Sequence, residues 1–145
     1  MQINEIHDLW AEDSKIDETR LDYESLKIPQ LHSKYFKIFS EERLRLWNLQ
    51  AELKQLKLDK HIFLTDGSSK EDYASRGWKL PPRGNIIRQD TQMYLDADAD
   101  LIKVGYKIAH QTEKIELLES IIENLNRRSF TIKNAIEFMR WTQGG

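Results

Sequence analysis

Two long stretches of this chain carry a large side chain at every third or fourth position, a spacing typical of helices that pack along a seam. The first seam contains Leu31, Tyr35, Ile38 and Glu42 and, after one extra four-residue step, Leu46, Leu49, Leu53, Leu56, Lys60 and Phe63. The second seam is unbroken and contains Leu101, Val104, Ile108, Gln111, Ile115, Leu118, Ile122 and Leu125. Because this period fits a helix and not a strand, the sequence predicts two long amphipathic helices.

Proline and glycine residues mark where these helices end. Pro29 suits the first position of a helix, because the N–H that proline lacks would be unpaired there anyway. The stretch between the seams contains three of the six glycines, two of the three prolines and no periodicity, which indicates a long loop. We therefore predict a single helical domain made of an acidic N-terminal segment (1–28), a long helix (29–63), a loop (64–93), a second long helix (94–126) and a C-terminal segment (127–145).

Two long helices joined by one loop should fold back on each other as an antiparallel hairpin, about 50 Å long at 1.5 Å per residue. Such a hairpin exposes too much apolar surface for a monomer. The C-terminal segment adds a further apolar stripe at Ile132, Ala135, Ile136 and Met139. The predicted fold class is therefore all-α: a long antiparallel helical hairpin with an additional C-terminal helix, assembled into a homo-oligomer.

The net charge of −2 hides a strong segregation of charge along the chain. Residues 1–25 hold eight acids and two bases, and residues 94–126 hold seven acids and three bases. In contrast, residues 26–63 hold eight bases and four acids, and residues 127–145 hold four bases and one acid. Separated blocks of this kind form a local positive surface or attract another copy of the chain, unless they are simply solvated helix faces.

Several kinds of chemistry lack any signal in the sequence. The chain has no cysteine, its four histidines lack zinc-site spacing, and it contains no phosphate-binding loop. The stretch "DADADL" resembles the start of a calcium loop, but Leu101 and Lys107 stand where that loop needs Gly and Glu. We interpret its aspartates as caps of the second helix. We expect no enzyme, no cofactor and no membrane span, and the acidic N-terminus without a signal-peptide core indicates a cytosolic protein.

Basic and aromatic residues interleave from the end of the first helix into the loop. Single-stranded nucleic acid needs this combination, because cations bind its phosphates and flat rings stack on its unpaired bases. The alternative is that Tyr73 and Trp78 pin the loop to the hairpin while the basic residues are solvated. The candidate DNA-binding residues are Lys54, Lys57, Lys60, His61, Phe63, Lys70, Arg76, Lys79, Arg83 and Arg88.

Three segments, in their order and spacing, resemble the UvsY family of recombination mediators of T-even-like phages, in its marine-phage form. They are "DSKIDETRLDYESLKIPQLHSKYFKI" (13–38), "YLDADADLIKVGYKIA" (94–109) and "NRRSFTIKNAIEFMRW" (126–141). The resemblance spans nearly the whole chain and is most specific in the Arg-x-Phe-x-Ile-Lys-x-x-Ile pattern from Arg128 to Ile136. The loop matches poorly.

The resemblance implies a non-enzymatic ring of six or seven copies that binds single-stranded DNA. Such proteins load the phage RecA-like recombinase UvsX onto DNA coated by the phage single-strand DNA-binding protein, in recombination and repair. The expected location is then the cytoplasm of the infected bacterial host. The resemblance also associates the C-terminal segment with assembly, through Phe130, Ile132, Ala135, Ile136, Met139 and Trp141.

The family carries a basic motif, Lys-Ala-Arg-Leu, before an aromatic pair and a Gly, and the matching stretch here is "LDKHIFLTD". Lys60 falls on the Arg position and Phe63 on the first aromatic position. Leu58, Leu64 and Asp66 depart from the pattern. Either Lys57, one residue earlier, or the arginines of the loop would supply the missing charge. Phe63 is also the last residue of the first seam, so it is either a base-stacking residue or a core residue.

The alternative function is a structural coiled-coil scaffold or assembly protein without nucleic-acid binding. A scaffold would show the same hairpin and the same apolar C-terminal segment. The basic and aromatic belt from Lys54 to Arg88 discriminates between the two, because a scaffold does not need it. For the C-terminal basic residues we expect acidic partners, in the second helix or at the N-terminus, in preference to DNA.

Overall fold

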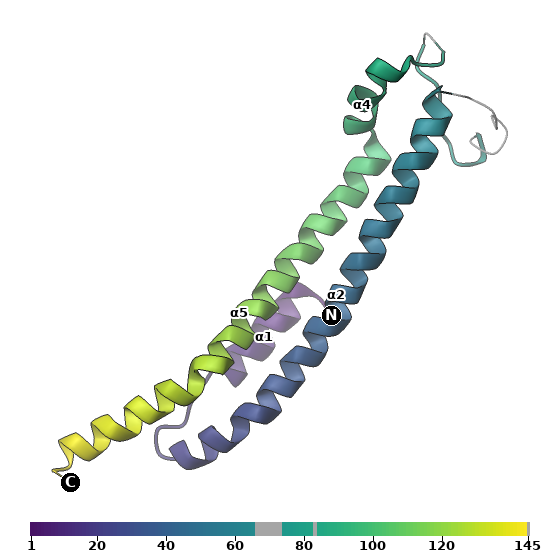
Figure 1. Cartoon of the computed structure of the whole chain (residues 1–145). Helices are drawn as coiled ribbons and strands as arrows, with labels where there is room; N and C mark the ends of the chain where they lie inside the picture. The colour runs from purple at the N-terminus through teal and green to yellow at the C-terminus, as the bar shows by residue number, and fades with distance from the viewer. Residues whose placement is uncertain (66–73, 83, 145) are drawn as a thin grey trace. The chain divides into compact units, whose positions relative to one another are not determined.

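The computed structural model describes residues 1–65, 74–82 and 84–144. Within these residues it contains helices and no strand, which confirms the all-α class (Figure 1). The helices are α1 (Ile3–Asp13), α2 (Leu21–Thr65), α4 (Arg88–Asp96) and α5 (Ala99–Thr142). The chain divides into two compact units, of which the first comprises Met1–Leu44 with Thr112–Gly145 and the second Arg45–Gln111. In each unit a stretch of α2 runs antiparallel to a stretch of α5 (Figure 1).

Helix α2 contains the first predicted seam. Every residue of that seam is buried or half-buried, so the predicted inward face is confirmed. The helix begins at Leu21, however, and Pro29 lies inside it instead of at its first position. Leu21 and Glu24 are buried and hold the extra turns in place. Proline has no N–H, so the carbonyl of Ser25 loses its hydrogen bond within the helix. Both Pro29 and Ser25 are exposed, so water can bind that carbonyl, which reduces the cost to helix stability.

Helix α5 contains the second predicted seam, and all of its seam residues are also buried or half-buried. The predicted end near Asn126 and the separate C-terminal helix are wrong, because α5 continues to Thr142. No Gly or Pro interrupts the chain there, and the inward stripe runs on through Leu125, Arg128 and Ile132 at the same spacing. The segment 127–145 is therefore largely the continuation of a long helix.

The predicted loop 64–93 contains helical residues at both ends. Leu64 and Thr65 complete α2, and α4 begins at Arg88. Helix α4 ends at Asp96, and the side chain of Asp98 then accepts a hydrogen bond from the Leu101 N–H at 3.0 Å. This bond is a helix N-cap, as we interpreted the aspartates of this stretch.

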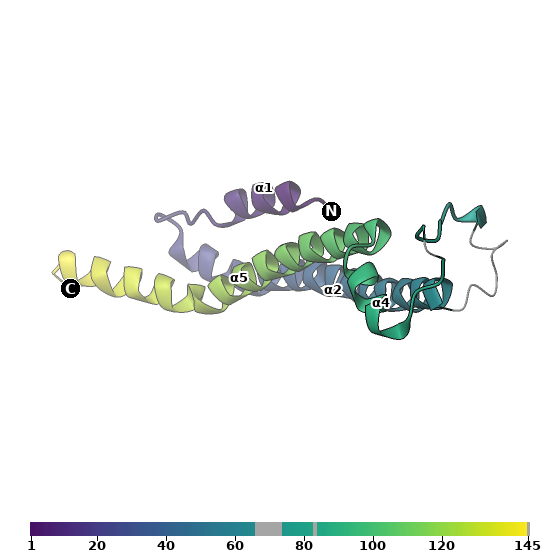
Figure 2. The same cartoon turned by 90° about the horizontal axis from the view of Figure 1, so that it is seen from above.

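The acidic N-terminal segment forms α1, which packs in the first unit. Figure 2 shows α1 along one side of the pair formed by α2 and α5. Ile6 is fully buried, and the ring of Trp10 meets the ring of Tyr35 edge-on at a centroid distance of 5.5 Å. The Asp13 carboxylate at the end of α1 accepts hydrogen bonds from Lys34 Nζ at 2.6 Å and Tyr35 Oη at 2.8 Å. These contacts fix α1 to α2.

A buried ion pair joins the two long helices in the first unit. Lys114 Nζ lies 3.1 Å from a carboxylate oxygen of Glu42, and both side chains are almost fully buried. Glu42 occupies a seam position of α2 in place of an apolar residue. A charge at such a position is tolerated only with a partner, so this pair favours one register of the two helices.

The hydrophobic core of the second unit lies where the end of α2 meets the loop. Its buried residues are Phe63, Leu64, Leu95 and Leu101, with Leu53, Leu56, Trp78, Leu80 and Ile86 packed against them. The Ile86 N–H donates to the Leu64 carbonyl oxygen at 2.9 Å, which ties the loop to the end of α2. No helix in the described part of the chain is both long enough and apolar enough to span a bilayer.

Candidate nucleic-acid interface

The predicted DNA-binding residues separate into exposed and buried groups. Lys54, Lys57, Arg76, Lys79 and Arg88 are exposed, and His61 is half-buried. Lys60 and Phe63 are buried. Two of the predicted residues, Lys70 and Arg83, lie outside the described residues.

Three of these side chains share one face of α2. Lys54, Lys57 and His61 are spaced by three and four residues, which places them one above another on the helix surface. Arg88, the first residue of α4, lines an open surface pocket together with His61. We call these four residues the basic stripe of the second unit. Asp96 lines a neighbouring depression with Lys57, so the stripe has an acidic border.

Lys60, by contrast, is buried and is held by two carboxylates. Its Nζ lies 2.8 Å from Asp100 Oδ2 and 3.1 Å from Asp98 Oδ1, and the residue is only 6% exposed. The same ammonium lies 4.1 Å from the centroid of the Trp78 ring, within cation–π range. Lys60 is therefore neutralised inside the unit, although the family pattern placed it among the DNA-binding residues.

The contacts of Asp100 lower the pKa of its carboxyl. The hydrogen bond from Lys60 holds the pKa of the Asp100 carboxyl below its ordinary value and outweighs the opposing effect of burial. A hydrogen bond from Trp78 lowers that pKa further. Asp100 is thus ionised at neutral pH and binds both Lys60 and Trp78.

Trp78 connects the loop to this cluster. Arg76 lies over its ring at 4.3 Å from the centroid and also pairs with Asp59 of α2 at 3.3 Å. The ring of Phe63 lies 5.6 Å from the ring of Trp78. Trp78 therefore pins the described part of the loop to the hairpin, which was the alternative interpretation of this residue.

Phe63 is a core residue of the second unit, as its seam position indicated. Its ring packs beside the ring of Trp78, and little of the residue reaches solvent. An aromatic residue that the sequence analysis did not consider is more accessible: Tyr94 of α4 is 40% exposed and lines a pocket with Lys79 and Trp78. Tyr94 was missed because it lies at the start of the predicted second helix, where a tyrosine gives no separate signal.

The predicted assembly residues of the C-terminal segment also differ in exposure. Ile132 is buried within the first unit, and Ala135, Ile136 and Met139 are half-buried. Phe130 and Trp141 are exposed, at 67% and 79%. Phe138, which was not among the predicted residues, is 64% exposed and its ring lies 6.3 Å from that of Trp141.

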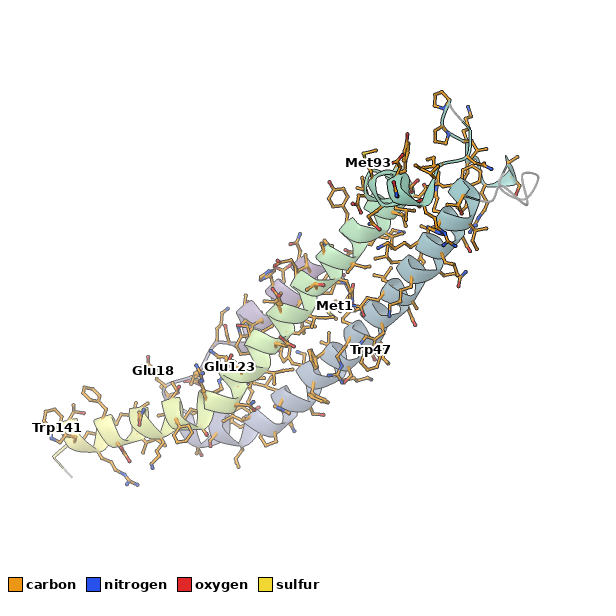
Figure 3. The ribbon with its side chains drawn as sticks, turned by 45° about the horizontal axis from the view of Figure 1, so that its top comes forward. Met1, Glu18, Trp47, Met93, Glu123 and Trp141 are labelled. Atoms are coloured by element: carbon orange, nitrogen blue, oxygen red, sulfur yellow. The ribbon has the colours of Figure 1, made fainter. Side chains whose placement is uncertain are left out.

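The three exposed rings lie on one face of α5. At about 100° per residue, Phe138 lies roughly 80° and Trp141 roughly 20° around the helix axis from Phe130, so the three rings share about a quarter of the helix circumference. We call Phe130, Phe138 and Trp141 the aromatic face of α5. Figure 3 shows Trp141 near the free end of α5, where the last turns extend past the start of α2.

Two of the four basic side chains of this region, Arg127 and Arg128, bind partners within the first unit. Arg127 pairs with Glu123 of the same helix at 2.6 Å. The buried Arg128 donates to the carbonyl oxygens of Asp13, Ser14 and Lys15, at the end of α1 and just after it. The expected partners were acidic side chains, and for Arg128 the partner is instead the backbone of the N-terminal segment.

Residues 9–145 match the family model described as "Recombination, repair and ssDNA binding protein UvsY". The fold resembles crystal structures of the bacteriophage T4 recombination mediator protein UvsY. In lattice type II the TM-score is 0.79 at 21% sequence identity, over 100% of this chain and 99% of that chain. Lattice type IV gives 0.76 at 19% identity, over 99% of both chains. Lattice type I gives 0.77 at 21%, over 96% of this chain and 98% of that chain.

No curated protein sequence matches this chain. At about one identical residue in five, the crystal structures establish a shared fold. That fold extends over both units, because the alignments cover almost the full length of each chain.

Proposed function

The chain belongs to the UvsY family, and from this premise we propose that it is a recombination mediator that binds single-stranded DNA. In this proposal it promotes loading of the phage RecA-like recombinase, UvsX, onto DNA coated by the phage single-strand DNA-binding protein. The family description names recombination, repair and single-stranded-DNA binding, and the T4 protein of the same fold is a recombination mediator. The place of action is the cytoplasm of the infected host.

The observation that carries DNA binding is the basic stripe of the second unit. Lys54 and Lys57 are exposed on one face of α2, and Arg88 extends the positive surface across to α4. Lysine and arginine side chains bind phosphates regardless of sequence, which suits a protein that must act along any stretch of single strand. Lys79 lies on the loop beside the exposed ring of Tyr94, which could stack on an unpaired base.

Each copy offers few cations, so the proposal includes assembly. We propose a homo-oligomeric ring of six or seven copies, in which the aromatic face of α5 packs against a neighbouring copy. The side chains of Phe130, Phe138 and Trp141 are all exposed. Large apolar side chains exposed close together are typical of a surface that binds another protein. A ring brings several stripes to one strand, so modest sites add up to tight binding.

A titration of the full chain with a fluorescent oligonucleotide tests the DNA-binding part of this proposal. We expect saturable binding of single-stranded DNA, weaker binding of a duplex of the same length, and a steep loss of affinity as salt rises. No binding at low salt would favour the alternative, a structural coiled-coil protein without a nucleic-acid partner.

The loading part needs a second assay. Recombinase filament formation on oligonucleotide coated by the single-strand DNA-binding protein should accelerate when the chain is added. A chain that binds DNA but leaves filament formation unchanged would limit the function to DNA binding.

A further inference from the structure

We propose that Lys60 is a positioning residue and not a phosphate ligand: held by Asp98 and Asp100, it fixes Trp78 and so presents Arg76 and Lys79 to single-stranded DNA. This inference rests on the proposed function, because it concerns how the DNA-binding surface is held. It also assigns to two acidic residues a role that supports the binding of a polyanion.

The first step is that the charge of Lys60 is already used. Asp98 and Asp100 both lie within ion-pair distance of its ammonium. A phosphate could reach Lys60 only by displacing one of them, and Asp98 is also the cap of α5. The cluster of one lysine and two carboxylates carries a net negative charge, so it repels a phosphate.

The second step is that Trp78 depends on this cluster. Its ring lies over the Lys60 ammonium at 4.1 Å, and its side chain donates a hydrogen bond to Asp100. Lys60 and Asp100 therefore act on the same side chain from two elements, α2 and α5. Removal of either partner loosens the position of Trp78.

The third step is that basic residues lie before and after Trp78 in the sequence. Arg76 is two residues before it and packs on its ring at 4.3 Å, while Lys79 follows it directly. Both reach solvent, unlike Lys60, and Arg76 also pairs with Asp59 at 3.3 Å, so Lys79 has the less neutralised charge of the two. A cation held in place loses less entropy on binding a phosphate than one on a mobile loop.

Asp100→Asn separates the two roles because they predict changes of opposite sign. A phosphate-binding Lys60 would gain from the loss of a competing carboxylate, so DNA affinity would rise. A positioning Lys60 loses a charged partner, and Trp78 is left with the weaker, neutral acceptor of an amide, so we expect affinity to fall by about fivefold, the scale of one partly exposed ion pair. Asp96→Asn is the matched control, because it removes the same charge from α4 without contacting Lys60, and its affinity should stay equal or rise.

The same titrations with Lys60→Met and Lys60→Arg complete the test. We expect Lys60→Met to lower the DNA affinity about as much as Asp100→Asn does. The double variant Lys60→Met/Asp100→Asn should bind no more weakly than either single variant. Lys60→Arg should retain most of the original affinity. Trypsin should cleave after Arg76 and Lys79 faster in Lys60→Met and Asp100→Asn than in the original chain, at unchanged helix content. If Lys60→Met fails to fold, Asp100→Asn decides, since that side chain is half exposed.

Tighter binding by Asp100→Asn, or a shallower salt dependence of Lys60→Met alone, would overturn the positioning role. A failure of the proposed function looks different, because the unmodified chain would then not bind the oligonucleotide at all.

Discussion

Arg128 of α5 donates a hydrogen bond from Nη2 to the carbonyl oxygen of Ser14, 2.8 Å away and 114 residues earlier in the sequence. The same nitrogen also reaches the carbonyl oxygen of Asp13 at 3.0 Å. The last carbonyls of a helix have no partner within it, and a cation at that end also interacts favourably with the helix dipole. One buried arginine thus fastens the N-terminal helix to the C-terminal half of the chain.

We predict that Arg128→Ala lowers the free energy of unfolding by roughly 1.5–3 kcal/mol, because it removes the charge-assisted hydrogen bonds to the carbonyl oxygens of Asp13, Ser14 and Lys15. Urea denaturation followed by circular dichroism measures this change. Arg127→Ala is the control, because Arg127 is exposed and forms only an i,i+4 pair with Glu123, worth about 0.5 kcal/mol or less. Equal losses of unfolding free energy in the two variants would show that Arg128 contributes no more to stability than an exposed ion pair does.

We predict that the first unit loses stability in acid through Asp13. Burial alone would raise the pKa of this carboxyl, but hydrogen bonds from Lys34 and Tyr35 outweigh it and hold the pKa below the ordinary value of 3.8. A carboxyl with a lowered folded pKa stabilises the fold above its unfolded pKa, and this contribution disappears as the pH falls through the folded pKa. The melting temperature should therefore drop below about pH 4.

Asp13→Asn provides the comparison for that titration. The variant should melt lower than the original chain at neutral pH, and the difference should shrink as the pH falls below 3.8. A constant difference across the acid range would show that Asp13 does not act through its charge.

We predict that Lys114→Met lowers the free energy of unfolding by roughly 1–3 kcal/mol, because it removes the closer of two cations beside the buried Glu42, the other being the N-terminal ammonium of Met1 at 3.6 Å. The double variant Glu42→Leu with Lys114→Met should recover most of that loss, since an apolar pair can replace a buried ion pair. Thermal melts of the three variants measure both effects. Additive losses in the double variant would contradict this account of the pair.

We predict that Phe138→Ser with Trp141→Ser yields a smaller species with unchanged helix content, because both rings are exposed and contribute little to the fold of the chain itself. Sedimentation velocity measures the mass. A complete truncation from Arg128 onward is a poorer test, since it also removes the residue that holds α1. An oligomer of unchanged mass would exclude the aromatic face from assembly.

The seams were predictable because burial along a long helix repeats with the helical period, and every seam residue is buried or half-buried in the structure. The start of α2 was not predictable from the sequence. Pro29 is a strong local signal for a helix start, but the tertiary packing of the buried Leu21 extends the helix beyond it. The continuation of α5 was missed because a change in charge at residue 127 was interpreted as a boundary, although the apolar stripe does not stop there.

The site was harder to predict than the fold. A lysine in a basic stretch looks the same in the sequence whether it faces solvent, like Lys57, or two aspartates, like Lys60. Asp100, one of the partners of Lys60, lies 40 residues later, in a stretch that we interpreted only as a helix cap. Only the three-dimensional arrangement shows that the charge of Lys60 is neutralised.

The salt dependence of single-stranded DNA binding, measured with the original chain and with Lys54→Ala/Lys57→Ala, tests the central claim most directly. We predict weaker binding by the double variant at equal oligomer mass. The slope of log affinity against log salt should be shallower by about 0.7 for each phosphate that the variant no longer binds. An affinity and a slope equal to those of the original chain would contradict the assignment of DNA binding to this face of α2.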